Sequence, residues 1–222
     1  DTARRLCDQH GVVLIFDEVI SAFRYRAGDV GQLYGIHSDL LTMGKVIGGG
    51  MPVAAVGGKA EIMDQIGRSS GAKVKFSGGT YSGHPASMLA ARVLVKYLIE
   101  NETNIYPELG RLGRLLRTMV LVVFDQAGVL ARFAGGESKV LANNSLQMLV
   151  IPYKDKGLMD QPNEVLDPEK VDITLTEKVL KLAMLLEDVH IIHGLGALST
   201  AHTEADIERV CGAFGRALDR IK

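Results

Sequence analysis

The sequence predicts an α/β protein in which strands and helices alternate along most of its 222 residues. Residues 12–16 are apolar at every position, which is typical of a strand buried on both faces, and Asp17 and Glu18 follow at its carboxyl end. Between residues 108 and 126, apolar side chains recur at steps of three and four, which indicates an amphipathic helix. Ligand sites of open α/β sheets lie at strand carboxyl ends, so Asp17 and Glu18 mark a candidate site.

The other elements follow from the same periodicities and from the turn residues that flank them. Residues 3–10 form the first expected helix, which Asp1 or Thr2 can cap and Gly11 would end. Pro85 suits the first position of a later helix, and Thr203 and Asp206 have the spacing of a capping box. We expect further helices over residues 59–66, 85–100, 108–126, 174–186 and 203–221, and strands over 40–43, 53–56, 129–133, 146–151 and 189–193. Residues 154–172 hold two prolines and many charges and predict a surface loop.

Composition limits the classes of function. With 47% hydrophobic residues, the chain can bury a sizeable core and divide into two lobes. A net charge of −1 argues against a nucleic-acid scaffold or a polybasic membrane surface, and the sequence contains no apolar span of about 20 residues. Two distant cysteines, Cys7 and Cys211, fit a reducing compartment, so we expect a cytoplasmic protein.

Residues 42–50 read Thr-Met-Gly-Lys-Val-Ile-Gly-Gly-Gly and are the most informative segment. They place Lys45 directly after an apolar run and just before three glycines. Glycine lets the backbone approach a flat ligand without a Cβ clash, so the pattern favours a reactive amine over a solvated surface lysine. Residues 77–85 form a second glycine-rich turn before a helix, where Thr80 and free backbone amides can hold a phosphate.

Together these stretches resemble the class III pyridoxal-phosphate aminotransferases, most closely the branch that includes glutamate-1-semialdehyde aminomutase. The likeness lies in residues 14–24, 38–58 and 79–85, with a looser match over 198–207. It implies a fold-type I transferase that binds pyridoxal 5'-phosphate through a Schiff base with Lys45. Asp17 would keep the ring nitrogen protonated, and Val19 would pack on the ring.

The resemblance also implies a partner and a domain plan. Gly79 and Thr80 would bind the phosphate of the neighbouring subunit's cofactor, which requires a homodimer, and the substrate would be a small amino acid or amine. Family members are roughly twice as long, so we expect this chain to be a C-terminal portion. Residues 1–127 would belong to the large mixed-sheet domain that binds pyridoxal phosphate, and residues 128–222 to a smaller α+β domain.

Three alternatives stay open. An apolar strand that ends in Asp-Glu is also the Walker B pattern of ATPases, but neither Gly44-Lys45 nor Gly58-Lys59 is followed by the Ser or Thr of a phosphate loop. A second alternative is a catalytically incomplete fragment that acts only as part of an assembly. Within the family, residues 190–197 lack the acidic residue typical of the aminomutase branch, which favours transamination over aminomutase activity.

For several individual polar residues, a structural interpretation competes with a functional one. His190 and His193 would lie on opposite faces of a strand, so a zinc site is not expected. His84 occupies a position where the family usually has Asn, and a turn-forming role is at least as plausible as a contact with the site. Arg24 and Arg26 can serve a substrate carboxylate, although arginines in a polar loop are usually solvent-facing.

Overall fold

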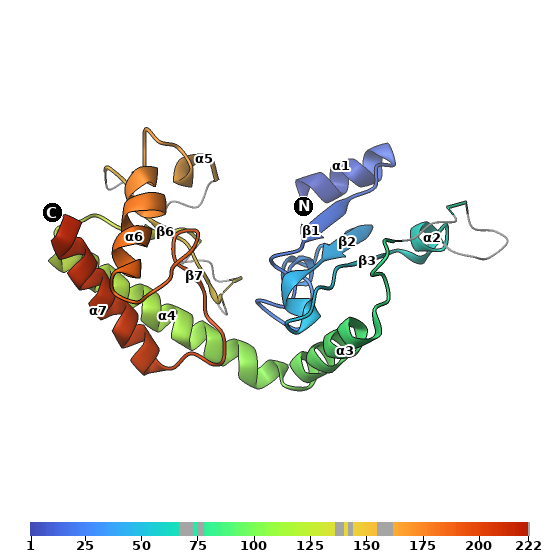
Figure 1. Ribbon diagram of the computed structural model, residues 1–222. Coiled ribbons are helices and arrows are strands. Elements are labelled where there is room, and N and C mark those ends of the chain that lie inside the picture. Colours follow the sequence, from blue (N-terminus) through green and yellow to red (C-terminus); the bar gives the residue numbers. More distant parts are fainter. Residues whose placement is uncertain (67–72, 75–77, 136–139, 142–143, 155–161, 222) are drawn as a thin grey trace. The chain divides into compact units, whose positions relative to one another are not determined.

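The structure is a computed structural model that describes residues 1–66, 73–74, 78–135, 140–141, 144–154 and 162–221 (Figure 1). The chain divides into two compact units, Asp1–Thr103 and Asn104–Lys222. The predicted boundary after residue 127, between a large cofactor-binding domain and a smaller α+β domain, stays a prediction. Within the part of the chain that is described, no helix is both long and apolar enough to cross a membrane.

The first unit is built on a mixed three-stranded sheet in the order β1-β2-β3. Its strands are β1 (Ile15–Glu18), β2 (Leu40–Met43) and β3 (Ala55–Gly58). β1 runs parallel to β2, and β3 runs antiparallel to it. The prediction of β2 is confirmed residue for residue, and the sheet confirms the α/β class.

The first predicted strand is displaced toward its carboxyl end. It begins at Ile15 and includes Asp17 and Glu18, whereas Val12 and Val13 precede it and are about half exposed. The Leu14 carbonyl already accepts hydrogen bonds from the N–H groups of Asp39 and Leu40, so pairing starts just before the strand. The two carboxylates therefore sit within the sheet register rather than beyond it.

Helices and turns complete the first unit. α1 (Thr2–His10) ends at Gly11, as the sequence predicts. Gly11 has a left-handed backbone (φ 63°), and its N–H donates a hydrogen bond to the Cys7 carbonyl. α2 (Ala60–Met63) is shorter than predicted, and α3 (Pro85–Glu100) matches its prediction. Single turns of 3₁₀ helix cover Gly31–Tyr34 and Lys45–Gly48.

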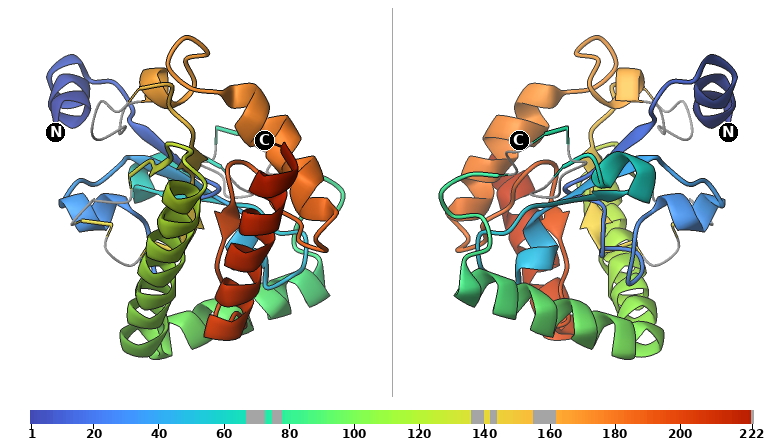
Figure 2. Two further views of the ribbon diagram at one scale, coloured as in Figure 1. Left: turned by 90° about the vertical axis from the view of Figure 1, so that its left-hand side faces the viewer. Right: turned by 90° about the vertical axis from the view of Figure 1, so that its right-hand side faces the viewer.

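The second unit has a helical core. α4 (Glu102–Gln126) starts six residues before the predicted position, since Pro107 is tolerated inside it. A π-helical turn, Leu175–Val179, leads into α6 (Leu180–Leu185), and Figure 2 shows α6 beside α7 (Glu204–Ile221). Phe124 of α4 and Phe214 of α7 are fully buried and meet edge to face with ring centroids 5.4 Å apart. The capping box is present: Thr203 N–H donates to Asp206, and Asp206 N–H donates to the Thr203 hydroxyl.

Strand predictions for this unit need correction. The predicted strand 146–151 is two short strands, β5 (Leu146–Gln147) and β6 (Leu149–Val150), because the two halves pair with different partners. β5 pairs with β7 (Gly196–Ala197), and β6 pairs with β4 (Arg132–Phe133), which is shorter than the predicted 129–133. The predicted strand 189–193 is wrong: His193 has φ 45°, and Ile192 forms only an isolated bridge to Leu195. In the predicted loop, α5 (Pro162–Val165) forms one turn, and residues 155–161 lie outside the described part.

Candidate active site

Asp17 and Thr42 face each other across the pairing of β1 with β2. The Thr42 hydroxyl donates a hydrogen bond to Asp17 Oδ1 at 3.2 Å, and the Val19 N–H donates to the same oxygen at 3.1 Å. Asp17 Oδ2 has no hydrogen bond to any residue that the structure describes. This oxygen is therefore available to accept a hydrogen bond from a ligand.

Lys45 follows β2 after Gly44 and carries an unusual backbone. Its φ of 47° lies in the left-handed region, which a residue with a side chain adopts at a cost of about 1 kcal/mol or more. The side chain is exposed, and Nζ forms neither a hydrogen bond nor an ion pair with the described residues. A strained backbone and an uncommitted amine together suit a residue whose partner is a ligand.

Val19 lies against the turn that carries Lys45. A Cβ atom on Gly44 would come within 3.2 Å of Val19 Cγ1, so the glycine lets the two segments approach closely. The sequence-predicted residues Asp17, Val19 and Lys45 thus lie on adjoining strand ends of one unit.

The glycine cluster after Lys45 has a structural reason as well. Gly49 has φ 59°, and a Cβ there would come within 3.1 Å of the Ala90 carbonyl oxygen on α3. Contact of this turn with α3 therefore requires Gly49. The interpretation that all three glycines make room for a flat ligand is too broad, because Gly49 also serves packing.

Glu18 differs from its neighbour Asp17 in role. Its side chain is buried at 4% exposure and accepts hydrogen bonds from the backbone N–H groups of Val30 and Gly31 and from the Ser21 hydroxyl. All of these bonds hold the loop that follows β1. Glu18 is therefore a structural carboxylate.

Asp39 anchors the start of β2 and was not singled out by sequence reasoning. It pairs with Lys59 at 2.6 Å and Arg4 at 2.9 Å, and it accepts the Leu14 N–H at 2.7 Å. The hydrogen bond from Lys59 comes first among the causes that hold the Asp39 pKa well below its usual range, and the same bond raises the Lys59 pKa. Lys59 is thus committed to a structural ion pair, unlike Lys45.

Gly79 and Thr80 lie in a separate turn of the first unit. Gly79 N–H donates to the Ser82 hydroxyl at 2.8 Å, and Thr80 is exposed. No hydrogen bond or ion pair within the described ranges joins Thr80 to Asp17 or Lys45, and residue 77 of the predicted motif lies outside those ranges. His84 caps α3, since its Nδ1 accepts the Ser87 N–H, which supports the turn-forming interpretation.

The two loop arginines are bound within the first unit. Arg24 Nε donates to the Ile20 carbonyl at 2.8 Å, and burial lowers the pKa of Arg24. Arg26 lies 3.7 Å from a Glu102 oxygen. Neither contact points to a ligand.

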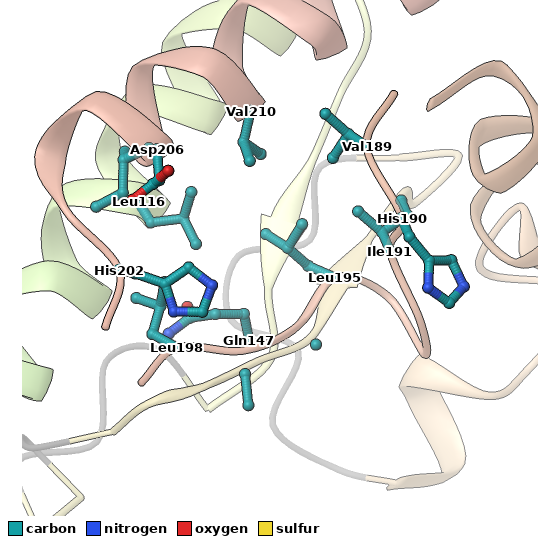
Figure 3. Close-up of a pocket in the computed structure, with 13 residues that line it drawn as sticks. Leu116, Gln147, Val189, His190, Ile191, Leu195, Leu198, His202, Asp206 and Val210 are labelled. Atoms are coloured by element: carbon teal, nitrogen blue, oxygen red, sulfur yellow. The ribbon is translucent and has the colours of Figure 1, made fainter. Parts of the chain in front are cut away.

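A cavity of about 110 Å³ lies in the second unit and contains no predicted site residue (Figure 3). Its lining is mostly apolar, and its polar members serve local structure. His202 Nδ1 accepts the Ser199 N–H at 3.0 Å, and Asp206 is held by Thr203. In Figure 3 the His190 ring points away from the other labelled side chains. Across the described ranges, no group of three or more His, Cys, Asp or Glu side chains is arranged to hold a metal ion. The candidate site is therefore in the first unit.

The site offers an amine and a carboxylate on neighbouring strand ends, with the apolar Val19 side chain against Gly44. Such a set fits a flat group that presents an electrophilic carbon to Lys45 and a basic ring nitrogen to Asp17. Two observations support this fit: within the described part of the chain, Asp17 Oδ2 accepts no hydrogen bond and Lys45 Nζ has no polar partner.

Comparisons with known proteins agree with this chemistry. A family model described as aminotransferase class-III matches residues 1–126. A curated relative from Alkaliphilus oremlandii, named glutamate-1-semialdehyde 2,1-aminomutase, is 33% identical over the whole chain and 48% of its own length. An omega-transaminase from Sphaerobacter thermophilus has a TM-score of 0.80 at 32% identity, over 98% of this chain and 46% of its own. A transaminase solved with PLP bound has a TM-score of 0.76 at 28% identity, with the same coverage. The chain thus spans about half the length of the relative and of each structure.

Proposed function

Because this chain belongs to the class-III aminotransferase family, we propose that it carries the lysine and the carboxylate of an enzyme that transfers amino groups with pyridoxal phosphate. The observation that carries the proposal is the pairing of β1 with β2, which sets Asp17 beside the segment that ends in Lys45. The fold prediction, a portion of a fold-type I transferase, is confirmed by structural similarity to two transaminases. The Walker B alternative is superseded, since the Asp-Glu strand lies inside the matched family region.

When bound, pyridoxal phosphate supplies an aldehyde that condenses with amines and a ring that takes up electrons released at the substrate carbon. Asp17 Oδ2 is the acceptor that holds a proton on the ring nitrogen. At a separation of about 4 Å and an effective dielectric constant of about 20, this ion pair is worth roughly 4 kcal/mol before desolvation. Val19, two residues further along, supplies an apolar contact for the ring.

Lys45 has two tasks in this proposal. Its Nζ holds the cofactor covalently, and as a free amine it moves a proton to and from the substrate carbon. Both tasks need an amine that is not committed to an ion pair. Lys45 meets this condition among the residues that the structure describes, whereas Lys59, bound to Asp39, does not.

The substrate is a small amino acid or amine, and transamination is the first candidate reaction. Residues 190–197 lack the acidic residue expected for the aminomutase branch, which favours transamination. Aminomutase activity is the second candidate, because the curated relative that aligns with the whole chain carries that name. Transamination needs an oxo acid to accept the amino group, whereas isomerisation within one molecule needs no second substrate.

The remaining parts of the proposal concern assembly and location. We propose a homodimer in which Gly79 and Thr80 contact the phosphate of the neighbouring subunit's cofactor. The exposed side chain of Thr80, which is available to a neighbouring subunit, supports this assignment. A cytoplasmic location is proposed from the two unpaired cysteines.

The test supplies the cofactor-loaded protein with an amino donor, with and without an oxo acid. Transamination predicts turnover only when both are present, and aminomutase activity predicts product from the donor alone. Lys45→Ala should abolish either reaction. Lys96→Ala is the matched control, because Lys96 lies on α3 of the same unit with its side chain 71% exposed. Equal loss of activity in both variants would argue against Lys45 as the reactive residue.

A further inference from the structure

We propose that Thr42 is a positioning residue, which fixes the Asp17 carboxylate relative to the segment that carries Lys45. This inference rests on the proposed function and deepens it. Thr42 is paired with Asp17 in the register of the parallel strands, and its hydroxyl donates to Asp17 Oδ1 at 3.2 Å. Neighbouring residues on paired strands present their side chains on the same face, so the backbone itself sets up this bond.

Two donors share Asp17 Oδ1, and they act differently. The Val19 N–H belongs to the chain that follows Asp17 directly, so it fixes the carboxylate only against its own strand. The Thr42 hydroxyl comes from β2 and makes the one hydrogen bond among the described residues that ties the Asp17 side chain to another strand. A carboxylate turns easily about its last bond, so two donors on Oδ1 hold Oδ2 in one direction.

Thr42 is also close to Lys45 along the chain. Met43 ends β2, and Gly44 leads directly into Lys45, whose backbone is held at φ 47°. The Thr42 hydrogen bond therefore links the strand with the carboxylate to the segment with the amine. A flat ligand that must reach both groups needs their separation to be fixed, and one misplaced group can lower turnover strongly.

A purely structural role for Thr42 predicts different consequences. Threonine is β-branched and favours strands whatever its hydroxyl does. Thr42→Val keeps the shape and the strand preference and removes the donor, whereas Thr42→Ser keeps the donor and removes the methyl group. The two variants therefore separate positioning from strand stability.

The first measurement uses the cofactor-loaded protein. Thr42→Val should lower kcat about tenfold, the size expected for one hydrogen bond to a charged group, with KM nearly unchanged. It should also shift the midpoint of a pH titration that follows the visible absorbance of the bound cofactor. In Thr42→Ser, both kcat and this midpoint should be close to those of the wild type. Wild-type kcat and an unshifted absorbance midpoint in Thr42→Val would overturn the inference, as would loss in Thr42→Ser equal to that in Thr42→Val.

The second measurement needs no cofactor. Thr42→Val, Asp17→Ala and the double variant are compared by denaturant unfolding of the chain. The change in the unfolding equilibrium constant of the double variant should differ by about twofold or more from the product of the two single-variant changes. A difference of this kind is expected for side chains in direct contact. Independent effects would refute the bond. If Lys45 failed to bind the cofactor, the proposed function itself would fall; if Lys45 bound it and Thr42→Val behaved as wild type, only the role of Thr42 would fall.

Discussion

Gly113, in the interior of α4, allows that helix to approach the backbone of the segment before β5 closely. A Cβ atom at this position would lie 2.4 Å from the Asn144 carbonyl oxygen, 3.1 Å from Gln147 Nε2 and 3.2 Å from Arg117 Nη1. The first of these atoms belongs to the backbone and cannot turn aside. Gly113→Ala should therefore destabilise the second unit.

The magnitude follows from two opposing effects. Alanine in place of a helical glycine favours the helix by up to about 1 kcal/mol, whereas overpacking of a tight contact costs about 1–3 kcal/mol. Because a backbone oxygen must move, we expect the upper part of that range and a net loss of about 1–2 kcal/mol. Gly212→Ala in α7 is the matched control. Its nearest atom is the flexible end of Arg216 at 3.4 Å, so the variant should gain about 0.5–1 kcal/mol.

Denaturant unfolding followed by circular dichroism measures both variants. The midpoint should fall for Gly113→Ala and rise for Gly212→Ala, with similar slopes. A gain in stability for both variants would show that α4 does not lie against Asn144 as described.

Two further predictions concern the first unit. Asp17→Asn should retain cofactor and lose turnover by about 10²-fold or more, because the ion pair to the ring nitrogen weakens by a few kcal/mol; near-normal kcat would refute the role. Asp39→Asn should destabilise the chain at neutral pH. Since the folded pKa of Asp39 is depressed, its contribution is present above about pH 4–5 and declines in more acidic solution, so wild type and variant should converge there in acid unfolding curves.

Sequence reasoning succeeded where local signals were strong. α3 begins at Pro85 and ends at Glu100 as predicted, and β2 has its predicted bounds, because proline, capping and periodicity act within a few residues. The capping box of α7 is a signal of the same kind.

It failed where partners distant in sequence decide the structure. The run 146–151 looks like one strand, but pairing with β7 and β4 divides it at Met148. Residues 189–193 are apolar enough for a strand, yet they form none, and His193 takes a left-handed backbone there. Local periodicity contains no information about such partners.

The candidate site shows the same contrast. Asp17 and Lys45 were predicted from residue type and flanking sequence, but the different environments of Asp17 and Glu18 depend on the loop at Val30, which closes over Glu18. Likewise, the Asp39–Lys59 ion pair joins the start of β2 to the residue after β3, and only the sheet register reveals it. The sequence does contain a carboxylate directly before one strand and a lysine directly after the next. These two residues indicate an ion pair only once the two strands are known to be antiparallel neighbours.

The most direct test of the central claim is to locate the cofactor on the chain. The loaded protein is reduced with borohydride and digested, and the peptides are mapped by mass. We expect the phosphopyridoxyl group on Lys45, whose amine has no partner among the described residues. The ion pair with Asp39 raises the pKa of Lys59 and should keep that amine protonated and unreactive. Modification of Lys59 or Lys73 in place of Lys45 would contradict the account.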